Sequence, residues 1–259
     1  MVVKKKREYS APALEKGFEI LELLAEQQKP MSLAQISTTL KRSKSELFRM
    51  LAALEKMGYL ERNTGSDLFH ITNRLFDLGL RVPPVGTLVE TAYPIMRELS
   101  ASIFQSCHIA VESQNRMVVI AKVENPSSVG FSVHLGHHLY LHESGSGRVL
   151  LAWKPEIEQQ NIIENLADID DSLDAEALKK SLPQIQRKGF AKVNSSIITS
   201  LVDISFPIFI GDSDQVIGTL TVPFLKGTSS SPAMKEVQQL IANTARQLSE
   251  LSVPYSGSL

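Results

Sequence analysis

The stretch from Ser32 to Ile71 constrains the fold of this chain most, because its spacing predicts a helix, a tight turn, a second helix and a β-hairpin. Ser32 and Gln35 have the spacing of a capping box, in which two side chains satisfy free amides at a helix start. The apolar residues that follow fall on one face: Leu33, Ile36 and Leu40. A short amphipathic helix is therefore expected to begin at Ser32.

Lys41 and Arg42 form the expected turn, and Ser43 with Glu46 repeats the capping spacing at the start of a second helix. Gly58 is expected to end that helix. Its apolar residues recur at three- and four-residue spacing and are expected to be buried: Leu47, Met50, Leu51, Leu54 and Met57. The opposite face of the second helix should therefore stay free.

Two short runs, Tyr59 to Arg62 and Leu68 to Ile71, flank the turn-forming residues 63–67. This pattern predicts a β-hairpin. Two helices joined by a tight turn and followed by a hairpin make a winged helix-turn-helix, an arrangement typical of DNA-binding domains.

The free face of the second helix carries residue types that suit the major groove of DNA. That groove is about 12 Å wide and admits one helix, whose early exposed residues meet base edges. Arginine can bond guanine through two hydrogen bonds, lysine and serine can bind bases or phosphates, and phenylalanine can contact a thymine methyl group. The predicted DNA-contacting residues are Lys41, Arg42, Ser43, Lys44, Ser45, Phe48, Arg49 and Arg62.

The alternative is that these charges form only a solvated helix face, or that the winged helix contacts protein. The chain has a net charge of −1, but residues 1–62 contain 12 of its 27 basic residues and 8 of its 28 acidic residues. A basic N-terminal part and an acidic remainder favour contact between the N-terminal part and phosphate. We therefore expect double-stranded DNA as a partner.

The chain resembles transcription regulators of the IclR family from Ala13 to Leu80, and more loosely to about Leu251. The segments that carry the resemblance are 13–21, 32–36, 54–60, 75–79 and, far downstream, Gly147 to Ala152. The resemblance implies a GAF-like effector-binding domain after the winged helix, and homodimers or homotetramers assembled through helices near the linker. A two-fold dimer would present two reading heads to a near-palindromic operator.

Length and composition are those of an ordinary two-domain protein, with 259 residues, 43% apolar and 21% charged. A single cysteine indicates a reducing compartment. No run of about 20 apolar residues and no signal peptide are present, so we expect a cytoplasmic protein that does not contact membranes.

Breaks in the pattern predict four regions. Residues 1–9 form a flexible basic arm, which enters a minor groove or, as we favour, stays solvated. Residues 10–81 form the winged helix-turn-helix domain, in which a first helix packs through Leu14, Phe18, Leu21 and Ala25. Residues 82–104 form the linker, with its break at Val82-Pro83-Pro84, and a helix; residues 105–259 form the effector-binding domain.

The last region alternates predicted strands and helices, which indicates an α+β fold in which helices cover an antiparallel sheet. The expected strands are 107–112, 117–123, 129–135, 139–142, 190–193, 202–209 and 216–224. The expected helices are 146–153, 156–165, 175–188 and 231–251. The fold class is therefore α+β, a winged helix-turn-helix joined by a linker helix to what the resemblance implies is a GAF-like α/β sandwich.

The best candidate for a small-molecule site is the glycine-containing turn at Ser144, Gly145, Ser146 and Gly147, which leads directly into a helix. Free amides at a helix start suit an anion or a hydroxyl-rich ligand, although the turn could equally be a plain helix cap. The resemblance implies that effectors bind near this helix start and against facing sheet residues. Alternation places polar groups on one face of the two late strands: Asp203, Ser205, Thr219 and Thr221.

Asp203 departs from the family, whose members commonly have a small residue or cysteine there and a glycine in the preceding loop, here 195–201. Many family effectors are small carboxylates, and a buried aspartate would repel one unless it were protonated or paired. The sequence therefore favours a small polar effector that bears a hydroxyl or an amine, with Asp203 as the acceptor.

The sequence favours neither a metal site nor a hydrolase active site. His134, His137, His138 and His142 lie within nine positions, but their spacing matches no closed metal site, so no metal or cofactor is expected. Ser144, Ser146, His142 and Asp203 would supply the residue types of a nucleophilic triad, as in a hydrolase, but the Gly-x-Ser-x-Gly turn is absent. A regulator, not an enzyme, is expected.

Overall fold

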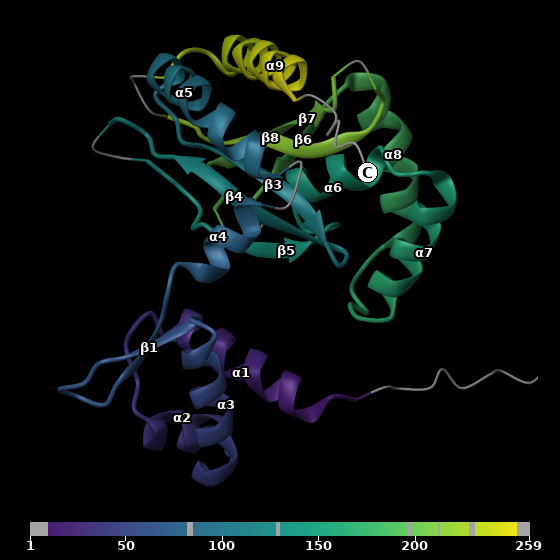
Figure 1. Cartoon of the computed structure of the whole chain (residues 1–259). Coiled ribbons are helices and arrows are strands. Elements are labelled where there is room, and N and C mark those ends of the chain that lie inside the picture. The colour runs from purple at the N-terminus through teal and green to yellow at the C-terminus, as the bar shows by residue number, and fades with distance from the viewer. Residues whose placement is uncertain are drawn as a thin grey trace, which may run out of the picture. The chain divides into compact units, whose positions relative to one another are not determined.

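The computed structural model describes residues 10–81, 85–127, 130–195, 198–211, 213–227 and 231–252 (Figure 1). The chain divides into two compact units, one ending at Arg81 and the other beginning at Val82. The predicted basic arm at residues 1–9 and the break at 82–84 lie outside the described residues.

The first unit contains four helices and a two-stranded sheet among its described residues. The elements are α1 (Pro12–Gln27), α2 (Leu33–Leu40), α3 (Lys44–Lys56), β1 (Leu60–Arg62), β2 (Phe69–Ile71) and α4 (Arg74–Leu80). Strands β1 and β2 pair antiparallel, and Met31 forms a bridge to Phe69 that fastens the hairpin to the chain before α2. The predicted order of two helices and a wing is confirmed.

The two predicted helix caps differ in detail. Ser32 and Gln35 form the complete capping box. Ser43 accepts a hydrogen bond from the backbone amide of Glu46, but the reciprocal bond from the Ser43 backbone amide to the Glu46 side chain is not formed, and the Glu46 carboxylate pairs with Lys16 and Arg42. The second capping box is therefore only half formed.

The small core of this unit is built from α1, α2, α3 and the hairpin. Its buried apolar residues are Ile20, Leu21, Leu23, Leu24, Met31, Ile36, Leu47, Leu51, Leu54, Leu60 and Phe69. The sequence prediction for α1 was partly wrong, since Leu14 and Phe18 are 61% and 51% exposed. Met57, expected to be buried, is 49% exposed as well. The reason is that α1 carries apolar residues on two faces, and only the face with Ile20 and Leu24 meets the core.

The second unit is a six-stranded antiparallel sheet in the order β5-β4-β3-β8-β7-β6. The strands are β3 (Cys107–Ser113), β4 (Arg116–Val123), β5 (His138–Tyr140), β6 (Ala191–Asn194), β7 (Leu201–Phe209) and β8 (Val216–Leu225). The helices are α5 (Val85–Ile103), α6 (Gly145–Ala152), α7 (Glu156–Ala167), α8 (Ala175–Lys188) and α9 (Met234–Leu251). The predicted α+β class with an antiparallel sheet is confirmed.

Helices cover both faces of this sheet (Figure 1). Helices α5 and α9 pack with Ile109, Ile204 and Leu220 in one core. Helices α6, α7 and α8 pack with Val119 and Ala191 in the other. Successive residues of β7 therefore point to different layers, and Asp203 and Ser205 face α6 while Ile204 faces α9.

One expected strand is absent. Residues 130–135, the described part of the segment predicted over 129–135, form no strand. On the edge of β4 away from β3, Arg116 to Val118 pair with β5, and Val119 exchanges backbone hydrogen bonds with Gly136 and His137. His142, expected at a strand end, lies in the turn that precedes α6.

Within the described residues, no helix is both long and apolar enough to cross a membrane.

Candidate DNA-binding and effector-binding sites

Helix α3 separates its apolar and polar residues as a recognition helix requires. Leu47 and Leu51 are fully buried, while Lys44, Ser45 and Arg49 are exposed and Phe48 is 52% exposed. These four side chains occupy the first six positions of the helix, the part that enters a major groove in helix-turn-helix proteins. In the part of the chain that the structure describes, neither Lys44 nor Arg49 has an acidic partner.

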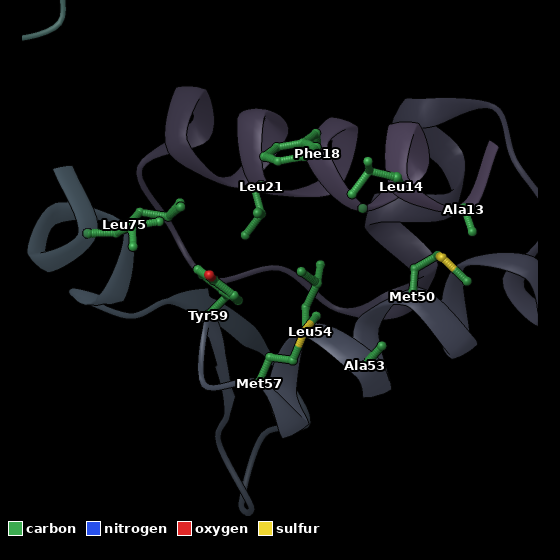
Figure 2. Close-up of a pocket in the computed structure, with 12 residues that line it drawn as sticks. Ala13, Leu14, Phe18, Leu21, Met50, Ala53, Leu54, Met57, Tyr59 and Leu75 are labelled. Carbon is green, nitrogen blue, oxygen red and sulfur yellow. The ribbon is translucent and has the colours of Figure 1, made fainter. Parts of the chain in front are cut away.

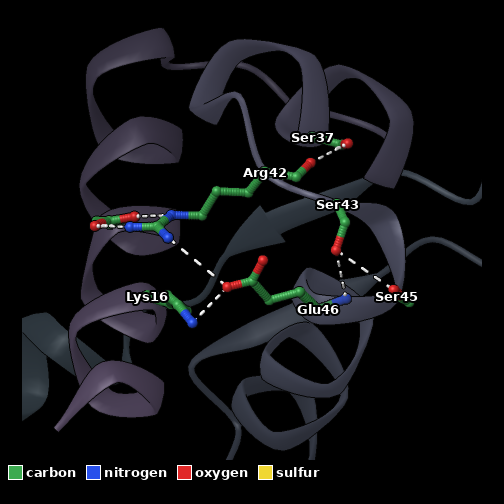
Figure 3. Close-up of polar contacts among 7 residues, drawn as sticks. Lys16, Ser37, Arg42, Ser43, Ser45 and Glu46 are labelled. Atoms are coloured by element: carbon green, nitrogen blue, oxygen red, sulfur yellow. Dashed lines mark hydrogen bonds and ion pairs between the residues drawn. The ribbon is translucent and has the colours of Figure 1, made fainter.

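Arg42 has a different role from its neighbours in the turn (Figure 3). Its guanidinium donates two hydrogen bonds of 2.7 Å to the Glu19 carboxylate of α1, and its Nη1 lies 3.7 Å from Glu46. Its backbone carbonyl accepts a 2.6 Å hydrogen bond from Ser37 of α2. The Arg42 side chain is thus engaged within the domain, whereas Lys41, its neighbour in the turn, is exposed.

The same network fixes α3 against α1. Lys16 of α1 pairs with Glu46, which also faces Arg42 (Figure 3). Hydrogen bonding from Arg42 lowers the pKa of Glu19, and hydrogen bonding from Lys16 lowers the pKa of Glu46. Both carboxylates are therefore charged at neutral pH, and they hold two cations of the helix-turn-helix in fixed positions.

Arg62, the cation predicted in the wing, is held by two neighbouring side chains. Arg62 pairs with Asp67 across the hairpin at 3.0 Å and stacks 5.5 Å from the centre of the Phe69 ring. The Asn63 carboxamide caps the turn by accepting hydrogen bonds from the amides of Gly65 and Ser66. Arg62 is therefore oriented by the wing, with 40% of its side chain exposed.

In the second unit, glycines allow the start of α6 to approach two other segments closely. A Cβ atom on Gly147 would lie 2.6 Å from the Cα of Leu141, and one on Gly145 would lie 2.7 Å from the Ser205 hydroxyl. Ser144 caps the helix by accepting the Gly147 amide at 3.0 Å. The two glycines are therefore required by close packing at the predicted turn.

A chain of buried hydroxyls joins α6 to the sheet. Ser146 lies 2.8 Å from Thr221, and Thr221 donates a 2.9 Å hydrogen bond to Ser205. Thr219, two residues earlier on β8, donates instead to the Ala110 carbonyl at 3.4 Å. The structure thus brings together four of the predicted residues, Gly145, Ser146, Ser205 and Thr221, and places Thr219 beside β3.

Asp203 lies at the same helix start, because a Cβ atom placed on Gly145 would lie 3.2 Å from the Cβ atom of Asp203. Burial raises the pKa of Asp203 to about 6. Among the described residues none donates a hydrogen bond to this carboxylate or pairs with it. The site therefore holds a half-buried carboxylate beside the start of α6.

Sequence reasoning missed His108, the fifth side chain of this cluster. It lies on β3 opposite Thr221, and its Nε2 is 3.5 Å from the Ser146 hydroxyl, while its buried Nδ1 meets no hydrogen-bond partner among the residues that the structure describes. Burial lowers the pKa of His108 to about 3, so the ring is neutral at physiological pH. The one available signal was a histidine inside the apolar run 107–111.

These contacts do not form a catalytic triad. A serine nucleophile needs a histidine base that a carboxylate orients through its other nitrogen. In the described part of the chain the Nδ1 of His108 has no carboxylate partner, and the hydroxyl of Ser144 is used in the helix cap. Within the described residues no three His, Cys, Asp or Glu side chains are grouped to hold a metal ion.

A winged helix with a free basic recognition face, in one chain with a domain that buries a polar site, defines a ligand-responsive DNA-binding regulator. Two family models match: the IclR helix-turn-helix domain over residues 13–64, and the bacterial transcriptional regulator IclR C-terminal domain over residues 85–250. The chain belongs to the IclR family of transcriptional regulators. It is a regulator with a DNA-binding and an effector domain, and not an enzyme, as the sequence predicted.

Similar proteins extend over nearly the whole chain. The regulator KdgR of Escherichia coli K12 is 26% identical over 93% of this chain and 92% of its own length. The repressor AllR of the same strain is 26% identical over 92% and 89%.

Among solved structures, a regulator of Alicyclobacillus acidocaldarius matches with a TM-score of 0.75 and 19% identity, covering 94% of this chain and 100% of the other. An IclR homologue of Microbacterium hydrocarbonoxydans, complexed with 4-hydroxybenzoate, matches with a TM-score of 0.76 and 20% identity, covering 92% and 98%. These likenesses establish the fold.

Proposed function

We propose that this chain binds a near-palindromic operator sequence-specifically, through the exposed face of α3 and the wing. The observation that carries the proposal is the separation of α3 into a buried face and a free face with Lys44, Ser45, Phe48 and Arg49. Lys41, Ser43 and Arg62 flank this face and are assigned to phosphate contacts, which position the protein without specifying sequence.

We further propose that a small polar metabolite binds at the start of α6, against β7 and β8. The support is the convergence of the buried Ser146, Thr221 and Ser205 and the half-buried Asp203 at this helix start. The complex of the Microbacterium homologue with 4-hydroxybenzoate supports a small-molecule effector in general, without indicating which one binds here.

The effector acts by binding with different affinity to two arrangements of the reading heads. Coupling of this kind is typically about 1–3 kcal/mol, and it must be reciprocal, so operator binding changes effector affinity by the same factor.

Homodimers are proposed from an apolar groove of about 290 Å³ on the first unit (Figure 2). Its walls come from α1, α3 and α4, and its large exposed side chains are Leu14, Phe18, Met57 and Leu78. Apolar surface of this extent on a small DNA-binding domain is costly in water and suits a second copy of the chain.

The test of DNA binding is selection of duplexes from a random library by the full-length protein at two salt concentrations, followed by sequencing. We expect a near-palindromic sequence to be enriched at both salt concentrations. The enrichment should be stronger at the higher salt concentration. Absence of any enriched sequence at both salts would favour a winged helix that contacts protein.

A further inference from the structure

Glu46 is an acidic residue in the first turn of α3, the part of the helix that is proposed to enter the major groove. Arg49 follows Glu46 by three positions, and residues three apart on a helix are neighbours on its surface. A free Glu46 carboxylate would therefore compete with DNA for Arg49, and it would repel the phosphates. Binding through α3 requires that this carboxylate be kept away from Arg49.

The structure turns the Glu46 carboxylate toward α1 (Figure 3). Lys16 of α1 forms an ion pair with it, and the Nη1 of Arg42 lies 3.7 Å from it. Among the described residues, Glu46 forms its ion pairs with these two cations and none with Arg49. The side chains of Lys16 and Glu46 are only 22% and 30% exposed, so solvent and salt screen this pair less than a fully exposed one.

Lys16 is the partner on which this arrangement depends most. Arg42 is committed to Glu19, because its Nε and Nη2 each donate a 2.7 Å hydrogen bond to that carboxylate. Its 3.7 Å contact with Glu46 is too long for a hydrogen bond. Lys16 and Arg42 together balance the charges of Glu19 and Glu46. Loss of Lys16 would therefore leave one negative charge in excess beside the DNA-binding face.

We propose that Lys16 is a positioning residue for DNA recognition, which holds Glu46 against α1 and so leaves Arg49 free to contact bases. This proposal rests on the proposed operator recognition by α3 and adds to it a residue of α1. Lys16 acts through Glu46 and does not itself touch DNA. The first helix of the domain thus determines how strongly the recognition helix binds, in addition to packing against it.

The test is the operator affinity of the full-length protein, measured by fluorescence anisotropy with the duplex that the wild type selects. Lys16→Met removes the charge and keeps an unbranched side chain. This variant should bind the operator about threefold to tenfold more weakly than the wild type, because the freed Glu46 carboxylate competes for Arg49 and faces the phosphates. Circular dichroism should show that both proteins are folded at the temperature of the measurement.

A second substitution separates this role from a direct contact between Lys16 and phosphate. Glu46→Gln removes the carboxylate that Lys16 holds, so Lys16→Met should have little effect in the Glu46→Gln background. Lys29→Met is the matched control, because it removes a lysine charge from an exposed position just after α1. Any effect of Lys29→Met on operator affinity should be the same with and without Glu46→Gln.

Two outcomes would overturn the proposal. Unchanged operator affinity in Lys16→Met would show that Arg49 stays free without Lys16. An equal loss of affinity in the wild-type and Glu46→Gln backgrounds would show that Lys16 contacts DNA directly. Both outcomes leave the proposed operator recognition standing, because the wild type still selects its duplex. A wild type that selects no duplex would remove the proposed function, and this inference with it.

Discussion

At the scale of single residues, Arg49 is the side chain on which specific DNA binding should depend most. Replacing Arg49 with alanine removes a group that can bond guanine through two hydrogen bonds, which is worth about 1–3 kcal/mol of discrimination. Fluorescence anisotropy with the selected operator should show a loss of roughly tenfold to a hundredfold, at an unchanged melting temperature. The exposed Arg246 of α9 is the matched control, and Arg246→Ala should bind normally.

Asp203 should destabilise the folded protein when no ligand is bound. Its pKa of about 6 lies above the unfolded value of 3.8, so the folded state holds the proton more tightly. The contribution of this residue to stability therefore declines as the pH rises from about 4 to 6, by about 3 kcal/mol. Asp203→Asn should melt at a higher temperature than the wild type at pH 7.5, and the difference should shrink at pH 4. A lower melting temperature at pH 7.5 would show that the carboxylate is compensated.

Some of the site residues could be predicted from the sequence, and others could not. Ser146, Ser205 and Thr221 could be found because alternation puts polar side chains where a core should be apolar. Arg42 was assigned to DNA because nothing in the sequence shows that Glu19, 23 residues away, takes both its hydrogen bonds. His108 was missed because its partners come from α6 and β8, and such long-range pairing is set by the fold.

At the scale of elements, the ion pairs between α1 and the turn should stabilise the helix-turn-helix. Replacing Glu19 with glutamine removes the charge that holds Arg42. The melting temperature of the Glu19→Gln variant should therefore lie modestly below that of the wild type at low salt. At 1 M salt the difference should nearly vanish, since exposed ion pairs are screened. The exposed Glu26 of α1 provides the control, because Glu26→Gln breaks no ion pair that the structure describes. Equal melting curves for the wild type and Glu19→Gln at low salt would show that the network is not stabilising.

The start of α6 should not tolerate a side chain at Gly147. A methyl group there would overlap the Leu141 backbone at 2.6 Å, and overpacking of this kind costs about 1–3 kcal/mol. Gly79 of α4 has open space around its Cβ position, so Gly79→Ala should be neutral or stabilising by up to about 1 kcal/mol. Chemical denaturation of both variants gives the comparison. A Gly147→Ala variant as stable as the wild type would mean that α6 can move away from the turn.

The positions of helices and strands along the chain were easier to predict from the sequence than the elements that each of them packs against or pairs with. Helices α2, α3, α8 and α9 and the long strands β7 and β8 follow local periodicity and caps, so the sequence placed them within a few residues. The segment 130–135 has the alternation of a strand but pairs with no strand in the described structure, and strand pairing is a property that no local pattern contains. The apolar groove of the first unit was likewise missed, because Leu14, Phe18 and Met57 have the spacing of core residues.

At the scale of the whole molecule, the apolar groove should hold two copies together. Replacing Phe18 with aspartate puts a charge into the groove and should convert dimers to monomers in sedimentation velocity. Phe48 is equally exposed but lies on the proposed DNA-binding face of α3, outside the groove, so Phe48→Asp should remain dimeric. Unchanged assembly of Phe18→Asp would place the dimer contact elsewhere.

The central claim is that this regulator binds DNA sequence-specifically through α3. The most direct measurement is the affinity of the full-length protein for its selected duplex and for a scrambled duplex of the same length, across a series of salt concentrations. We predict that both affinities fall with salt, because phosphate contacts release counterions, and that the selected duplex binds about a thousandfold or more tightly throughout. Equal affinity for the two duplexes at every salt concentration would contradict the claim.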